Sequence, residues 1–161
     1  KGMSHYPDNI FPGMVANRAA EFPDFKVLTI EGAGVRPDEV RTYRQLWDNG
    51  QRMAQAMLDL GIAPGERVAL LMANHAEFVE AMVAAGIVGA AVVPIDPRTK
   101  GDKLHFMLSN SQCSAAIAAD YVLPRLPPLR GRRARRRSSG GTCRCEAPRR
   151  RRARRGRPAR R

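Results

Sequence analysis

Apolar runs alternate with amphipathic stretches along the first 124 residues of this chain. Residues 68–72 form an unbroken apolar run without polar alternation, which is typical of a strand covered on both faces. Residues 75–88 repeat apolar side chains at helical spacing, Gly89 is a typical helix stop, and residues 90–93 form a second apolar run. The pattern therefore predicts a strand, a crossover helix and a second parallel strand.

Short polar residues predict where the helices begin. Asn74 and Glu77 have the spacing of a capping box, in which two side chains satisfy free backbone N–H groups at a helix start. Thr42 and Gln45 have the same spacing. The N-cap residues expected for the four helices are, in chain order, Asn9, Thr42, Asn74 and Thr99.

The other predicted elements complete an α/β pattern. They are a hairpin at residues 26–30 and 40–43, a last strand at 115–119, and helices at 10–22, 42–60 and 99–110. In the first helix the apolar residues at helical spacing are Phe11, Val15, Ala19 and Phe22. Helices that alternate with buried strands indicate an α/β fold with a layered sheet and one strand–helix–strand crossover.

Three motifs in this region resemble the adenylate-forming, or AMP-binding, superfamily. Residues 42–46, Thr-Tyr-Arg-Gln-Leu, resemble its first core motif, and residues 86–98, GIVGAAVVPIDPR, resemble its second. Residues 61–70 match the stretch that links the two motifs in the family. The resemblance covers roughly residues 9–124 and implies a partial N-terminal subdomain of the AMP-binding enzyme fold. Ala91, where peptide-activating members often carry Tyr, favours the acyl-CoA synthetase type.

The resemblance also implies a reaction, although the matching residues correspond only to the scaffold of the enzymes that catalyse it. Family members activate a carboxylic acid with ATP to an acyl-adenylate and pass the acyl group to coenzyme A, with Mg²⁺ stabilising the phosphates. In the family, a Ser/Thr/Gly-rich loop ending in Pro-Lys-Gly, later nucleotide motifs and a C-terminal lysine supply the contacts. All lie beyond the matching part, so we expect a truncated ligase, inactive alone, with no catalytic, cofactor-binding or metal-ligating residue to assign.

The composition changes abruptly near Pro124. Residues 1–124 contain 11 Lys and Arg against 14 Asp and Glu, a net charge of −3, whereas residues 125–161 contain 17 Arg and one Glu, a net charge of +16. Residues 127–161 hold a single Leu and no Val, Ile, Met or aromatic residue. Burial there cannot offset about 1–2 kcal/mol per residue of backbone entropy, so a disordered basic tail at 125–161 is predicted. A frame shift near Pro127 is our hypothesis for its origin, and a gene without a family-like continuation in another frame would contradict it.

Two segments could bind ligands. Asp96 and Arg98 follow the second strand, at the strand end where α/β sheets bind ligands, although a structural role is favoured. Residues 138–142, Ser-Ser-Gly-Gly-Thr, imitate a phosphate loop, but no Lys-Gly follows and no strand precedes them. Without that context the sequence favours a chance run within the tail.

The remaining polar and aromatic candidates have structural interpretations. His75 is expected as a solvated first-turn residue, and His105 as a surface residue, because no nucleophile is placed to use it. Glu77 and Glu80 are expected to form a solvated helix face, and Trp47 to lie in the core.

Cysteine usage and hydropathy predict a cytoplasmic protein. Cys113 stands alone, and Cys143 and Cys145 have no nearby His or further Cys, so neither a zinc site nor a disulfide framework is expected. The N-terminal residues lack the apolar region of a signal peptide, and no stretch approaches the ~20 apolar residues of a membrane span. Because the rest of a family domain would supply neighbouring elements, exposed apolar surface and self-association are also expected.

The Arg-rich tail offers an alternative function, non-specific nucleic-acid binding. Its 17 Arg would release counterions from RNA or DNA, whereas no interleaved aromatic residues are present to stack on bases. Deleting residues 125–161 should therefore abolish both the binding and its steep salt dependence in a salt titration. A truncated chain that binds nucleic acid as tightly as the whole chain would contradict this alternative.

Overall fold

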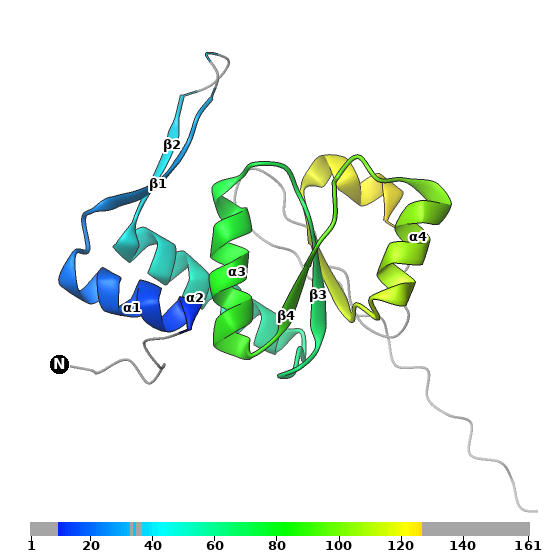
Figure 1. Ribbon diagram of the computed structural model, residues 1–161, viewed down its shortest axis with the longest axis horizontal. Helices are drawn as coiled ribbons and strands as arrows, with labels where there is room; N and C mark the ends of the chain where they lie inside the picture. The colour runs from blue at the N-terminus through cyan, green and yellow to red at the C-terminus, as the bar shows by residue number, and fades with distance from the viewer. Residues whose placement is uncertain (1–9, 33, 35–36, 127–161) are drawn as a thin grey trace, which may run out of the picture.

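The computed structural model describes residues 10–32, 34 and 37–126 (Figure 1). The elements are α1 (Phe11–Glu21), β1 (Lys26–Ile30), β2 (Glu39–Thr42), α2 (Tyr43–Asp59), β3 (Arg67–Leu71), α3 (Ala76–Val88), β4 (Ala91–Pro94), α4 (Gly101–Asn110), β5 (Ala115–Ala118) and the 3-10 helix η1 (Asp120–Arg125). The order is the predicted one, with η1 added after the last strand. Asn9, the basic tail from residue 127 onward and the run at 138–142 lie outside the described residues.

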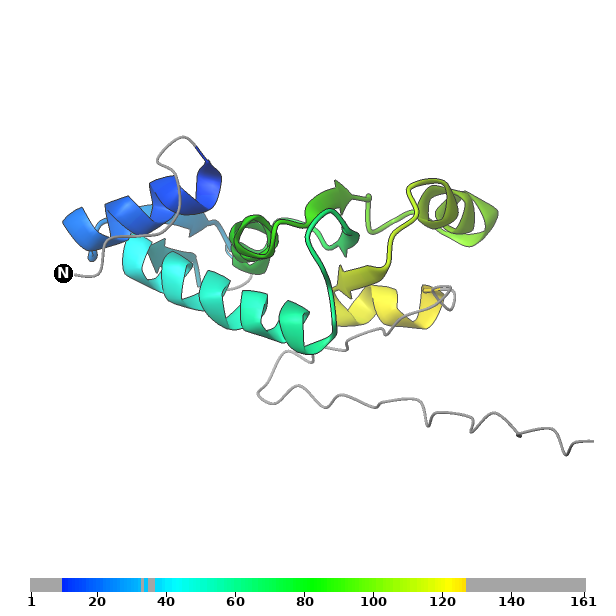
Figure 2. The same cartoon turned by 90° about the horizontal axis from the view of Figure 1, so that it is seen from below.

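β3 is the centre of a three-stranded parallel sheet with the strand order β4-β3-β5. Its apolar residues have no exposed surface, as the unbroken run predicts. Val68 packs with residues of α2 and α3, whereas Ala69 and Leu71 pack with residues of α4 and η1. Helices therefore cover both faces of the sheet (Figure 2), and the predicted strand–helix–strand unit is confirmed.

β1 and β2 form a second, separate sheet, an antiparallel hairpin. The hairpin extends away from the helices (Figure 1), and none of its strand residues is buried. The predicted strand at 26–30 is confirmed, and its partner lies one residue earlier than predicted.

The predictions for the ends of α2 and α3 are partly confirmed. Thr42 and Gln45 form the expected capping box, in which the Gln45 N–H donates to Thr42 Oγ1 over 3.3 Å and the Thr42 N–H to Gln45 Oε1 over 3.0 Å. Gly89 ends α3 in the left-handed region, with a φ of +77°. Both features follow from local chemistry that needs no tertiary contact.

The N-caps predicted at Asn74 and Thr99 are wrong. The N-cap residues are His75 and Lys100, and neither side chain makes a capping hydrogen bond. After β3 the His75 N–H donates to the Ala73 carbonyl over 2.9 Å, and this tight turn delays the start of α3. Thr99 likewise lies in a turn, in which its N–H donates to the Asp96 carbonyl over 2.9 Å.

The apolar face predicted for α1 is also partly wrong. Val15 is buried as expected, but Phe11 and Phe22 are 41% and 53% exposed. The face of α1 that packs against α3 begins at Pro12, which is buried. The two helices approach closely there, because a methyl group on Gly86 of α3 would lie 2.9 Å from Pro12 Cδ. Close approach of the two backbones decides which side of α1 faces inward.

Gly50 permits an equally close contact between α2 and α3. A methyl group at this buried position would lie 2.6 Å from Val83 Cγ1 and 3.0 Å from Val83 Cβ. Distances below 3.0 Å require neighbouring atoms to move, and Val83 is itself fully buried.

We expect Gly50→Ala to lower the free energy of unfolding by about 1–2 kcal/mol, because overpacking outweighs the gain in helix propensity. Urea unfolding followed by circular dichroism measures the change. Gln51→Ala, at an exposed position on the same helix, is the matched control and should change little. A Gly50→Ala chain at least as stable as the parent would contradict this helix contact.

Candidate functional site

The carboxyl ends of β3, β4 and β5 meet at one edge of the parallel sheet. From this edge β3 leads to α3 on one face, while β4 and β5 lead to α4 and η1 on the other. Connections that diverge in this way create the crevice in which open α/β sheets bind ligands. The segments at this edge are residues 72–75, 95–100 and 119–121.

Tyr121 links the ends of β3 and β5. Its hydroxyl oxygen accepts a hydrogen bond from the Ala73 N–H over 3.0 Å and lies 3.5 Å from His75 Nε2. The rings of Tyr121 and His75 are 6.2 Å apart at their centroids. The prediction placed His75 in the first turn of α3, whereas it is the N-cap residue, and its half-buried side chain lies beside an aromatic ring. Tyr121 was missed, although its position directly after the last predicted strand was the available signal.

Asp96 and Arg98 form a closed pair in the turn after β4. The Arg98 N–H donates to Asp96 Oδ1 over 2.8 Å, and Arg98 Nη2 donates to Asp96 Oδ2 over 2.7 Å. The side-chain hydrogen bond from Arg98, followed by the backbone one, lowers the pKa of Asp96 to about 2. Arg125 Nη1 also donates to the Pro97 carbonyl over 3.5 Å, which ties η1 to this turn. These charged groups stabilise the turn, in agreement with the structural role that the sequence favours.

The described residues of this edge do not fit a magnesium–triphosphate group. A bound Mg²⁺ needs oxygen ligands, usually including one or two carboxylates. Within residues 10–32, 34 and 37–126, no three His, Cys, Asp or Glu side chains gather where they could hold a metal. The negative charge of Asp96 is already paired with the guanidinium of Arg98.

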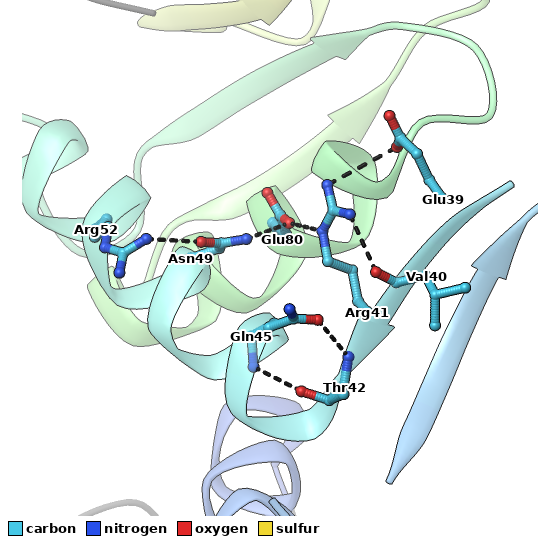
Figure 3. A network of polar contacts seen from close by, with 8 residues as sticks. All are labelled: Glu39, Val40, Arg41, Thr42, Gln45, Asn49, Arg52 and Glu80. Carbon is cyan, nitrogen blue, oxygen red and sulfur yellow. Dashed lines mark hydrogen bonds and ion pairs between the residues drawn. The ribbon is translucent and has the colours of Figure 1, made fainter. Parts of the chain in front are cut away.

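Glu80 is the clearest departure from expectation, since its side chain is only 2% exposed. Figure 3 shows the polar side chains around it. Its Oε1 atom accepts hydrogen bonds from Arg41 Nε of β2 over 2.9 Å and from Asn49 Nδ2 of α2 over 2.7 Å. The predicted solvated face at Glu80 is wrong because α2 packs against this side of α3 and Arg41 reaches it from the base of the hairpin. From helical periodicity alone, a carboxylate on a helix is expected to face solvent. The sequence does not show that a cation distant along the chain, such as Arg41, will pair with it.

The polar groups around Glu80 stabilise its ion pair with Arg41. Arg52 Nη1 donates to Asn49 Oδ1 over 3.0 Å, which orients the Asn49 amide toward Glu80 (Figure 3). Partial burial disfavours the charged form of Arg41, but the hydrogen bond and charge of Glu80 outweigh this, and the pKa of Arg41 is raised. Glu39 adds a further carboxylate oxygen 3.8 Å from Arg41 Nη2. A carboxylate in this position is stable only because it is paired and hydrogen-bonded.

The other candidates are structural or lie at the surface. His105 is exposed on α4, as predicted, and Trp47 is partly buried against the cluster of Val15 and Leu46. Burial raises the pKa of the Cys113 thiol, although the Ser111 hydroxyl at 3.2 Å opposes the shift. A reactive cysteine needs a lowered pKa and access to solvent, and Cys113 has neither.

Membrane insertion through the helices of the described ranges is not indicated. None of them combines the length and the apolar character that crossing a bilayer requires.

The class of protein to which this α/β fold belongs is given by a family match. The chain matches the family model of the AMP-binding enzyme over residues 15–150, and it belongs to this family. The match continues past Pro124 into the part of the chain outside the described residues. The mixed α/β architecture corresponds to the N-terminal part of the fold of these enzymes.

Two relatives and one solved structure illustrate the similarity. N-(5-amino-5-carboxypentanoyl)-L-cysteinyl-D-valine synthase of Penicillium rubens is 32% identical over 124 residues, which cover 76% of this chain and 3% of that protein. Long-chain-fatty-acid–CoA ligase FadD13 of Mycobacterium tuberculosis is 34% identical over 116 residues, which cover 72% of this chain and 22% of that protein. The structure of Mycobacterium tuberculosis fatty acyl CoA synthetase matches with a TM-score of 0.63 and 34% identity over 70% of this chain and 22% of that one. The chain thus spans a minor part of the length of its relatives.

Proposed function

We propose that these residues form the N-terminal scaffold of an acyl-CoA synthetase. The longer protein would join a carboxylic acid to ATP, release pyrophosphate, and transfer the acyl group from AMP to coenzyme A. The observation that carries the proposal is the family match over residues 15–150 on the parallel sheet and its flanking helices.

The proposed substrate is a carboxylic acid of the fatty-acid class. The relatives include both a peptide synthase and a fatty-acid–CoA ligase. Ala91 favours the second group, since peptide-activating members often carry Tyr at the matching position. A cytoplasmic location fits a ligase that uses ATP and coenzyme A.

The 161-residue chain alone is proposed to be inactive. Adenylate formation needs groups that neutralise a triphosphate as negative charge moves between its oxygens. At the sheet edge Arg98 is bound to Asp96, and Lys100 is exposed at the N-cap of α4. Among the described residues no three His, Cys, Asp or Glu side chains gather to hold a metal. In this proposal the scaffold supports the fold, and the groups that bind the triphosphate and the metal come from other parts of a ligase.

An exchange assay tests this proposal. The purified 161-residue chain should catalyse no acid-dependent exchange between ATP and labelled pyrophosphate with any of a panel of fatty and aromatic acids. A fatty-acid–CoA ligase of the same family, assayed in parallel, shows that the conditions support exchange. Exchange above the no-acid blank by this chain would overturn the proposed inactivity.

A further inference from the structure

The β1–β2 hairpin is attached to the molecule by few contacts. It is not paired with the β4-β3-β5 sheet, and its strand residues are half-buried or exposed. Among the described hairpin residues, Val27 packs against the apolar cluster of Val15, Leu46 and Val83. Two-stranded sheets are marginally stable by themselves, so the position of this one depends on what holds it to the helices.

Two kinds of contact hold the hairpin. At its base, the Tyr43 N–H donates to the Phe25 carbonyl and the Arg44 N–H to the Pro23 carbonyl, both over 3.1 Å. Two residues before Tyr43, at the same end of the hairpin, the Arg41 side chain leaves β2 and reaches Glu80 on α3 (Figure 3). The base contacts anchor one end as a hinge would, and the ion pair fastens the strands to the helix.

We propose that the hairpin opens and closes as a unit separate from the parallel sheet, and that the Arg41–Glu80 ion pair holds it closed. Segments with few buried apolar contacts open locally before the core does. Asn49 also donates to Glu80 Oε1, so the carboxylate keeps a hydrogen-bond partner when Arg41 withdraws. Opening therefore costs the ion pair but leaves the carboxylate hydrogen-bonded inside the α2–α3 contact, and the sheet can stay intact.

Hydrogen–deuterium exchange of the full 161-residue chain tests the proposal. The double variant Arg41→Met/Glu80→Gln removes both charges, keeps both side-chain stems, and leaves an amide oxygen that can accept from Asn49. The matched control is Arg18→Met/Glu21→Gln, which removes an exposed ion pair of 2.8 Å by the same substitutions.

A two-stranded sheet detached from the helices is only marginally stable, so its own strand hydrogen bonds then open as well. Peptides that cover β1 and β2 should therefore exchange about tenfold to a hundredfold faster in the first variant, the effect of losing a charge-assisted hydrogen bond. In both chains the peptides of β3 should remain more protected than those of the hairpin and should depend more strongly on added urea, because they open only with the core. The control variant should match the parent throughout. Unchanged exchange in the hairpin would overturn the proposal. Equal protection and equal urea dependence of the hairpin and β3 in the parent chain would also overturn it, because the hairpin would then open only when the whole fold unfolds.

Discussion

One buried carboxylate connects three elements that are distant in the sequence. Glu80 lies on α3, and its Oε1 atom receives donors from β2 and from α2. A charge that is 2% exposed would be costly without partners, so Arg41 and Asn49 both stabilise α3 in its place. This constraint fixes how the hairpin, α2 and α3 meet, and α2 and α3 in turn cover one face of the parallel sheet.

The family motifs have structural roles in this part of the fold. Thr42 and Gln45 of the first motif form the capping box that begins α2 directly after Arg41. In the second motif Gly86 admits Pro12 of α1, and Asp96 closes the turn at the sheet edge with Arg98. In the described part of the chain, the residues by which the family is recognised build the scaffold.

Local chemistry accounts for what the sequence predicted well. The unbroken apolar run became the buried strand β3, Thr42 and Gln45 became a capping box, and Gly89 became a left-handed helix end. Tertiary contacts account for the failures. Asn74 lost its capping role to a tight turn that Tyr121 stabilises from beyond β5, and Glu80 was assigned to solvent because its partner Arg41 is 39 residues away. At the sheet edge, Asp96 and Arg98 were predicted because they follow the carboxyl end of a strand. The same reasoning applied to the last strand would have predicted Tyr121 at this edge.

A double-mutant cycle on Arg41 and Glu80 tests the central role of this ion pair most directly. The free energy of unfolding in urea is measured for the parent chain, Arg41→Met, Glu80→Gln and the double variant, and the coupling energy is calculated from the four values. A coupling energy of about 1.5–3 kcal/mol is expected for a hydrogen-bonded charge pair in this partly buried setting. The same cycle on the exposed Arg18–Glu21 pair should give at most about 1 kcal/mol. A coupling energy for Arg41 and Glu80 no larger than that of the exposed pair would contradict the account.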